Sequence, residues 1–194
     1  MRRTCYLLLR SFAKWIAISS ILPAMGCAVS SPYPTAWPQV KQVRDVESQI
    51  EGSYNCRGDI VTCGTAGDQP KASAADFLIA SNTSATGCDH ITILRPKPDE
   101  IEISLFGSGV PTRRLVYMRG KDYRIEGNWI VLRSTGFSSA SAYGVGHTSV
   151  ETCISLSSED DLIMQGKNSS TGALLFVIPL GVSGTDWGRF DRTQ

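Results

Sequence analysis

The sequence predicts an all-β domain, an antiparallel meander of about 8–10 strands that forms a small barrel or sandwich, with one short N-terminal helix. From Ser53 onward, apolar residues recur at every second position in short runs, and turn-forming residues separate the runs. The runs follow one another at roughly ten-residue spacing, which is typical of antiparallel architectures. No helical pattern lies between them, so parallel βαβ units are not expected.

The first 26 residues have the order of regions found in a secretory signal peptide. Four basic residues come first, and an apolar run from Trp15 to Met25 follows them. A run of this length is too short to span a bilayer, which takes roughly 20 apolar residues. Residues 1–26 are therefore predicted to be a signal peptide.

The segment from Leu22 to Cys27 ends this apolar run and resembles the lipobox of bacterial lipoproteins. Gly26 fits the pattern, whereas Ala24 stands where that family prefers an aliphatic residue. The resemblance implies that Cys27 carries the lipid and begins the mature chain. It also implies, from Ala28 at the next position, a lipid anchor in the outer membrane on its periplasmic face. Ordinary cleavage nearby and an uncleaved anchor are the alternatives.

The charge of the mature chain argues against two classes of partner. The full chain has a formal net charge of +1, and the signal peptide carries four basic and no acidic residues, so the remainder carries −3. A weakly acidic surface is unsuited to nucleic acid, which requires a basic stripe. It is equally unsuited to electrostatic docking on a membrane. The membrane contact that we expect is the lipid anchor, and the expected partner is an envelope protein or an apolar small molecule.

Residues 27–39 are predicted to be a lipidated tether, and residues 40–194 a single β domain. The tether is rich in proline and serine and is expected to be extended and semi-rigid. Its aromatic residues, Tyr33 and Trp37, are suited to lie either against the membrane surface or against the domain.

One short amphipathic helix is predicted at the start of the domain. Val40, Val43, Val46 and Ile50 recur at near-helical spacing, with charged residues between them, over two to three turns. Gly52 ends this helix or opens the first strand.

The strands that follow are predicted from alternation of apolar and polar residues. The alternating runs are Ile91 to Ile93, Ile101 to Leu105, Leu115 to Tyr117, Tyr123 to Ile125, Ile130 to Leu132, Val150 to Leu156 and Leu162 to Met164. Turns are predicted at Pro96–Asp99, Glu126–Asn128 and Ser158–Asp161. The continuous apolar run from Leu174 to Leu180 is predicted as a central strand, and the segment from Trp187 to Phe190 closes the chain.

Two stretches, residues 57–75 and 134–149, lack periodicity and are predicted to be long loops. A long loop held on a rigid β scaffold is where binding residues tend to lie. The second stretch contains Phe137, Tyr143 and His147, which supply apolar area and a titratable polar group. These three are the binding candidates. His147, with serines nearby, is also the one plausible general base of a periplasmic hydrolase, which we keep as an alternative without naming a catalytic set.

Four cysteines of the predicted mature chain are left after Cys27. They are an even number in a chain predicted to be exported, so Cys56, Cys63, Cys88 and Cys153 are expected to form two disulfides. Four cysteines allow three pairings, and the sequence does not choose among them. Their spacing does not match paired zinc ligands, so no metal and no cofactor is expected.

A second resemblance involves the two ends of the predicted domain. The order Gly52, Ser53, Tyr54 after a short helix resembles the G-x-W start of lipocalin-like barrels, with tyrosine in place of tryptophan. In that family a basic residue near the C-terminus covers the aromatic ring, which would be Arg189 or Arg192 here. The resemblance implies a carrier that holds an apolar small molecule inside a barrel, and this is a further alternative function.

Overall fold

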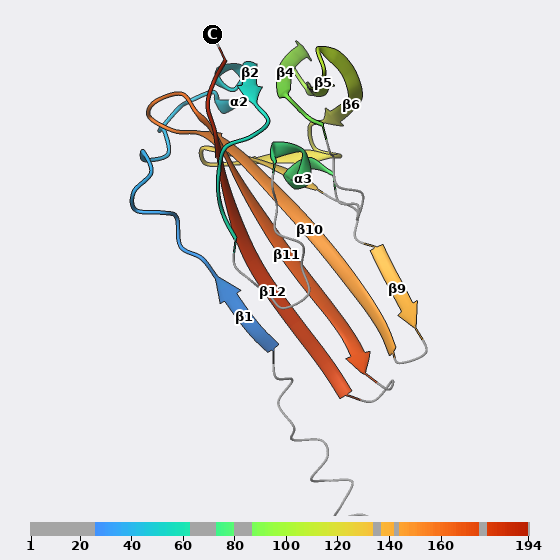
Figure 1. The fold of residues 1–194 in the computed structure, drawn as a ribbon. Coiled ribbons are helices and arrows are strands. Elements are labelled where there is room, and N and C mark those ends of the chain that lie inside the picture. Colours follow the sequence, from blue (N-terminus) through green and yellow to red (C-terminus); the bar gives the residue numbers. More distant parts are fainter. Residues whose placement is uncertain are drawn as a thin grey trace, which may run out of the picture.

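The computed structural model describes residues 26–62, 73–79, 87–133, 137–141, 144–174 and 178–193. Within them the chain is mostly β-strand and forms two sheets, which confirms the predicted all-β class (Figure 1). The described strands do not close into a barrel. Of the two predicted architectures, the observed one is therefore the sandwich-like arrangement.

The larger sheet has the strand order β1-β12-β11-β10-β8-β7, with β3 paired to β12 and β9 paired to β10. Its pairs are antiparallel except for β1 and β12, which run parallel. Its strands are β1 Gly26–Ser30, β3 Asp59–Val61, β7 Tyr123–Glu126, β8 Trp129–Arg133, β9 Phe137–Ser141, β10 Gly144–Leu156, β11 Leu162–Leu174 and β12 Ile178–Phe190.

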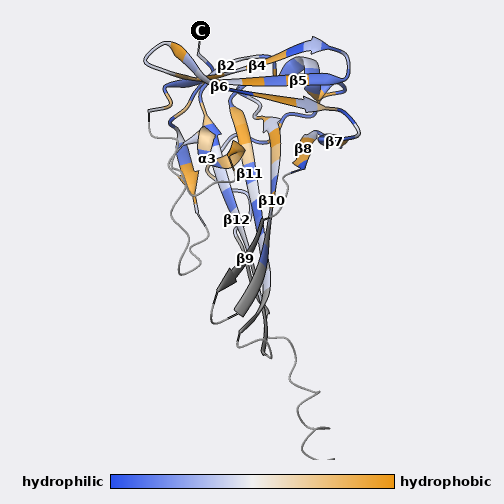
Figure 2. Cartoon of the chain, turned by 90° about the vertical axis from the view of Figure 1, so that its right-hand side faces the viewer, coloured by the Kyte–Doolittle hydropathy of each residue, from blue (hydrophilic) through white to orange (hydrophobic). Residues whose placement is uncertain are grey.

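The smaller sheet has the order β2-β4-β5-β6 and lies across one end of the long strands (Figure 2). Its strands are β2 Gly52–Asn55, β4 His90–Lys97, β5 Glu100–Gly107 and β6 Val110–Met118. The alternation seen in the sequence decides which face is covered, because Ile101, Ile103 and Leu105 of β5 are all buried. The predicted turn between β4 and β5 is also present.

The core lies between the smaller sheet and the adjoining part of the larger one. Apolar side chains from both sheets and from two short helices form one buried cluster. Its largest fully buried members include Tyr54, Tyr123, Phe77 and Phe190. Aromatic side chains of this size fill the space between the sheets, and burying each contributes a few kcal/mol.

The two short helices are α2 Val46–Gln49 and α3 Ala74–Leu78. The first is shorter than the two to three turns predicted, because Asp45 caps it by accepting a hydrogen bond from the Ser48 N–H at 3.3 Å. The second begins at the end of the stretch 57–75, which was predicted to be a loop, and continues beyond it. It begins with a capping box in which the Asp76 carboxylate accepts from the Ser73 N–H at 2.9 Å.

Strands β10, β11 and β12 continue well beyond the core (Figures 1 and 2). We call the part where the two sheets face each other the head. We call β1, β9 and residues 144–150, 168–174 and 178–184 the stem. The stem is a single extended layer that leaves the head at the end opposite the smaller sheet.

Two sequence predictions fail in the stem. Residues 137–141 and 144–149 belong to β9 and β10, which pair in register, and are not a long loop. The run from Leu174 to Leu180 is not one central strand, because Leu174 ends β11, Ile178 begins β12, and these two residues pair with each other. These strands consist largely of small residues and are held together by backbone hydrogen bonds. Their apolar and polar residues do not alternate as they do in a strand that packs on a core, so the two-residue periodicity did not reveal them.

Candidate functional site

Cys27 lies on the stem, in β1, where its backbone pairs with Val182 of β12. The two strands run parallel, and both point from the free end of the stem toward the head (Figure 1). A chain that begins at Cys27 therefore begins beside the lower half of β12. Eight strand residues separate the level of Val182 from Phe190 in the core, or roughly 26 Å of extended chain.

A row of charged residues crosses the strands at the boundary between head and stem, with Glu151 and Lys167 on one face of the larger sheet and Asp186 on the other. Glu151 of β10 pairs in register with Lys167 of β11, and their side chains form an ion pair at 3.3 Å. Arg124 adds a second contact to Glu151 at 2.9 Å, and Asp186 of β12 accepts a hydrogen bond from Asn168 at 3.3 Å. Burial alone would raise the pKa of Glu151, but the hydrogen bonds from Arg124 and Lys167 outweigh it and hold that pKa below its usual range.

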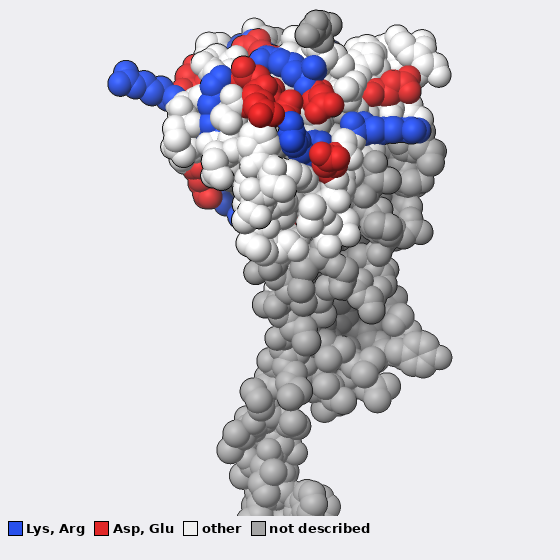
Figure 3. All heavy atoms as spheres, turned by 60° about the vertical axis from the view of Figure 1, so that its left-hand side comes forward, with Lys and Arg blue, Asp and Glu red and all other residues white. Residues whose placement is uncertain are grey.

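On the stem side of this row the sequence contains no Asp, Glu, Lys or Arg. Residues 134–150 and 168–185 are uncharged throughout, and so are residues 26–40. Together these segments contain the whole stem. Figure 3 shows Lys, Arg, Asp and Glu side chains over the described surface of the head. The change from charged to uncharged surface thus falls at one level across three neighbouring strands.

The segment after β1 packs along the larger sheet through a cluster of aromatic rings. The Trp187 indole N–H donates to the Ser31 carbonyl at 2.8 Å, and the Tyr33 ring meets Trp187 edge-on at 5.2 Å between centroids. The ring centroids of Trp37 and Tyr33 lie 6.1 Å apart, and those of Trp129 and Trp187 lie 6.0 Å apart. Tyr33 therefore lies against the domain, which is one of the two places predicted for it, and Trp37 packs on the Tyr33 ring.

The same segment is then held by its backbone. The Lys41 N–H donates to Leu156 and the Ser158 N–H donates to Gln39, each at 2.8 Å. Residues 31–41 are thus bound to the head, and β1 before them is bound to the stem. The predicted boundary at residue 40 does not separate a free tether from the domain. A group attached at Cys27 would be held at a fixed place on the sheet.

The predicted binding residues lie on the stem hairpin formed by β9 and β10. Phe137 begins β9 and pairs with Thr148, while His147 pairs with Thr171 of β11 and is exposed. Tyr143 lies outside the described residues. The structure thus brings the backbones of Phe137 and His147 to neighbouring positions on a regular sheet. An exposed position on such a sheet gives little support to the hydrolase alternative, which requires an enclosed substrate site around its base.

One of the predicted disulfides is present, between Cys56 and Cys88, with an S–S distance of 2.07 Å. It joins the end of β2 to the start of β4, where the Cys56 N–H also donates to the Asp89 carbonyl at 2.9 Å. Cys63 lies outside the described residues. Cys153 is a free thiol, so the prediction that it forms a disulfide is wrong.

The surroundings of Cys153 explain this correction. Cys153 lies on the face of β10 opposite to Thr152 and Ile154, but this second face is covered too, and only 2% of the residue is exposed. Val131 and Gln165 are its partners on the neighbouring strands, and Glu151 and Lys167 lie beside it. Burial raises the pKa of the Cys153 thiol. The residue therefore behaves as a packed structural cysteine.

A buried carboxylate in the head was missed by the sequence analysis. Glu47 of α2 is only 2% exposed and accepts a hydrogen bond from the Tyr123 hydroxyl at 2.6 Å. Arg119 and Arg95 lie 3.2 and 3.4 Å from its other oxygen. The spacing of Val43, Glu47 and Ile50 on one helical face is the signal that could have revealed it. Because Tyr123 lies in β7, Arg95 in β4 and Arg119 directly after β6, the cluster fixes α2 to both sheets.

The predicted contact between Tyr54 and a C-terminal arginine is also present. The guanidinium of Arg192 lies over the Tyr54 ring, 5.5 Å from its centroid, whereas Arg189 pairs with Asp161 and Glu159. The Tyr54 hydroxyl donates to the Ile50 carbonyl at 2.8 Å. Burial raises the pKa of Tyr54 to about 12, although Arg192 acts in the opposite direction.

Because the pKa of Tyr54 is raised in the folded protein, we expect the protein to lose stability at alkaline pH. Unfolded tyrosine ionises near pH 10 and folded Tyr54 near pH 12, so its contribution is complete below pH 10 and is lost as the pH rises from 10 to 12. We expect the free energy of unfolding to fall by about 2 kcal/mol from this group by pH 12. Urea unfolding of the wild type and of Tyr54→Phe, from pH 8 to 11.5, measures it. An equal pH slope in both proteins would contradict the assignment.

Within the described ranges, no group of three or more histidine, cysteine, aspartate or glutamate residues is placed to hold a metal ion. No helix in that part of the chain is long and apolar enough to cross a membrane. Comparison of the chain with protein-family models, with curated proteins and with solved structures finds no match.

Proposed function

We propose that the chain is an exported lipoprotein, held by a lipid on Cys27 at the periplasmic face of the outer membrane, and that its head is a binding domain for another envelope protein. The observation that carries this proposal is the place of Cys27. It lies on the uncharged stem, which leaves the head on the side away from the smaller sheet. An anchor at that end directs the head away from the membrane.

The attachment of the segment after Cys27 supports the same arrangement. Residues 31–41 pack on the larger sheet through Tyr33, Trp37 and backbone hydrogen bonds. A protein anchored through this segment holds its head at a fixed height instead of moving on a flexible linker. A fixed orientation suits a domain that presents one surface to a partner.

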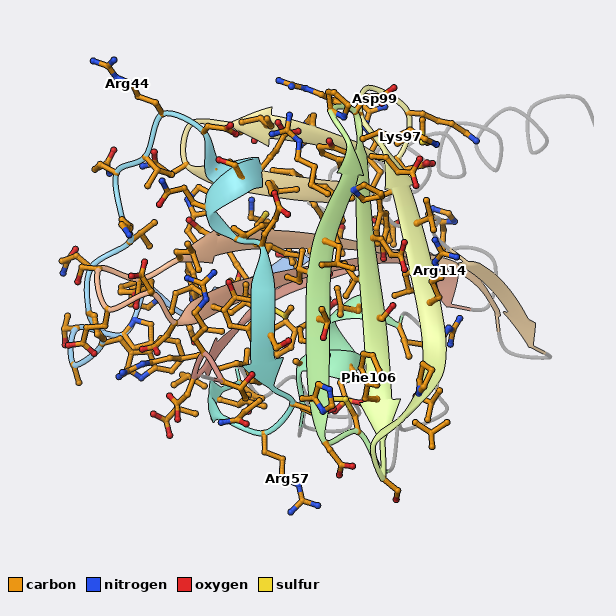
Figure 4. The ribbon with its side chains drawn as sticks, turned by 90° about the horizontal axis from the view of Figure 1, so that it is seen from above. Arg44, Arg57, Lys97, Asp99, Phe106 and Arg114 are labelled. Carbon is orange, nitrogen blue, oxygen red and sulfur yellow. A yellow bond between two sulfur atoms is a disulfide. The ribbon has the colours of Figure 1, made fainter. Side chains whose placement is uncertain are left out.

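The filled interior favours a protein partner over a small molecule inside the fold. Large aromatic and aliphatic side chains occupy the space between the two sheets, and the described strands form no closed barrel. The outward face of the smaller sheet, seen from above in Figure 4, is the surface that such an anchor turns outward. Leu94 and Val116 on this face are 47% and 46% exposed, on either side of Glu102. Exposed apolar side chains beside charged ones are typical of a transient protein interface.

Membrane fractionation of a Cys27→Ser variant tests the anchor. Wild-type protein should sediment with outer membranes, whereas the variant should appear in the soluble fraction or accumulate as unprocessed precursor, because it has no thiol to receive a lipid. Ala28→Ser is the matched control, since it changes the next residue and keeps the thiol, and it should behave as the wild type. A processed Cys27→Ser protein that still sediments with outer membranes would overturn the proposal.

A further inference from the structure

The strands of the stem extend beyond the level of Cys27. Cys27 pairs with Val182, and β12 begins four residues earlier, at Ile178, which pairs with Leu174 at the end of β11. Four residues of extended strand span roughly 13 Å. The ends of β11 and β12 therefore lie about 13 Å farther from the head than Cys27 does.

The composition of these strand ends differs from that of the head. Residues 172–174 and 178–180 are glycine, alanine, leucine, isoleucine, proline and leucine, without a charge or a hydroxyl group. The row of Glu151, Lys167 and Asp186 lies on the other side of Cys27, since Asp186 is four residues along β12 from Val182. Along the strand direction, Cys27 thus lies between the apolar ends of β11 and β12 and the charged row.

We propose that the ends of β11 and β12 enter the lipid leaflet that holds the acyl chains of Cys27, so that the protein contacts the bilayer with strands as well as with lipid. This inference rests on the proposed lipid anchor. Acyl chains attached at Cys27 run past the apolar strand ends if the charged row stays in water. The uncharged part of β12, from residue 178 to residue 185, is roughly 23 Å long, about half the thickness of a bilayer with its headgroups.

The pairing of the strands limits the depth of this contact to the interfacial region. β1 pairs with β12 only from Gly181 onward, so the outer edge of β12 from Ile178 to Leu180 has no partner in the described pairings. An open sheet edge is not tolerated in the hydrocarbon core, where water cannot satisfy its backbone groups. The boundary between headgroups and acyl chains still supplies water and polar groups. The strand ends therefore occupy that boundary and do not cross the membrane.

Depth-dependent fluorescence quenching on the lipidated full-length protein tests this contact. In a Cys63→Ala, Cys153→Ala background, single cysteines are introduced at Thr171 and Ser169 on the stem and at Val110 on the head, all three exposed in the structure. Each is labelled with the environment-sensitive dye NBD and reconstituted in phosphatidylethanolamine–phosphatidylglycerol vesicles that contain nitroxide lipids. We expect blue-shifted emission at Thr171→Cys and quenching several-fold stronger than at Val110→Cys, with Ser169→Cys intermediate.

The outcomes separate the inference from the anchor on which it rests. Equal quenching at all three positions, in protein whose Cys27 is shown by mass spectrometry to carry lipid, overturns the inference and leaves the anchor standing. Unmodified Cys27 in the same preparation overturns the anchor itself. Dye–dye self-quenching at Thr171→Cys without nitroxide quenching means that strand ends of two copies contact each other, and this also overturns the inference.

Discussion

Replacing Glu47 by alanine should lower the free energy of unfolding by about 3–5 kcal/mol, because it removes one member of a buried charged cluster. The carboxylate is 2% exposed and faces Tyr123, Arg119 and Arg95. Without it, the Tyr123 hydroxyl loses its acceptor inside the core, Arg119 loses the counter-charge of Glu47, and Arg95 keeps only its ion pair with Asp45. Urea unfolding followed by circular dichroism measures the change.

A surface carboxylate provides the matched control for this substitution. The side chain of Glu126 also pairs with an arginine, Arg124, at 2.5 Å, but it is 55% exposed. Solvent screens such a pair, so Glu126→Ala should change the stability by less than about 1 kcal/mol. Similar small effects of both substitutions would show that the Glu47 cluster does not fix α2 to the sheets.

Removal of the Cys56–Cys88 disulfide should cost about 3–4 kcal/mol, the value expected for a cross-link over a sequence separation of 32 residues. The bridge restricts the unfolded chain between β2 and β4. We expect the double variant Cys56→Ser, Cys88→Ser to unfold at lower urea concentration than the wild type and to be insensitive to dithiothreitol.

Cys153 provides the control for the redox part of this experiment. It is a free thiol, so Cys153→Ala should keep the full response of the wild type to dithiothreitol. The free-thiol count before and after reduction identifies which state is measured. Unchanged stability of wild-type protein after complete reduction of its disulfide would contradict the stabilising role of the bridge.

The sequence predicted the parts of the fold in which one strand face packs on the core. Ile101, Ile103 and Leu105 alternate with polar residues, and β5 has the expected buried face. The turn between β7 and β8 was predicted from the residue types of Glu126–Asn128. In the structure Gly127 adopts a positive φ of 60° there, a conformation that glycine favours. In both places a local chemical preference and the packed core require the same structure.

The stem escaped prediction because its strands do not depend on that alternation. Residues 144–150 and 168–174 are held by backbone pairing between neighbouring strands, and many of them are glycine, serine or threonine. Such residues are also typical of loops, so composition suggested a loop where the chain forms β10. The missed signal was the absence of charge over two separate segments, which reveals a common surface only when the register places them side by side.

The candidate site shows the same division. The sequence pattern predicts Cys27 as the site of lipid attachment, but it gave no indication that β1 pairs with β12 or that Tyr33 packs the following segment on Trp187. Likewise, the residues around Cys153 did not indicate that the sheet face on which its thiol lies is also covered. Contacts between segments distant in sequence decide both features.

The proposed anchor and the proposed orientation of head and stem both depend on the chemical state of Cys27. Mass spectrometry of the N-terminal peptide of the mature protein, isolated from outer membranes, measures that state in one experiment. We predict a chain that begins at Cys27 and carries more than one acyl chain, since a single chain binds a membrane only marginally. An unmodified N-terminus at Ala28 or beyond would contradict the lipid anchor and, with it, the orientation proposed for the stem and the head.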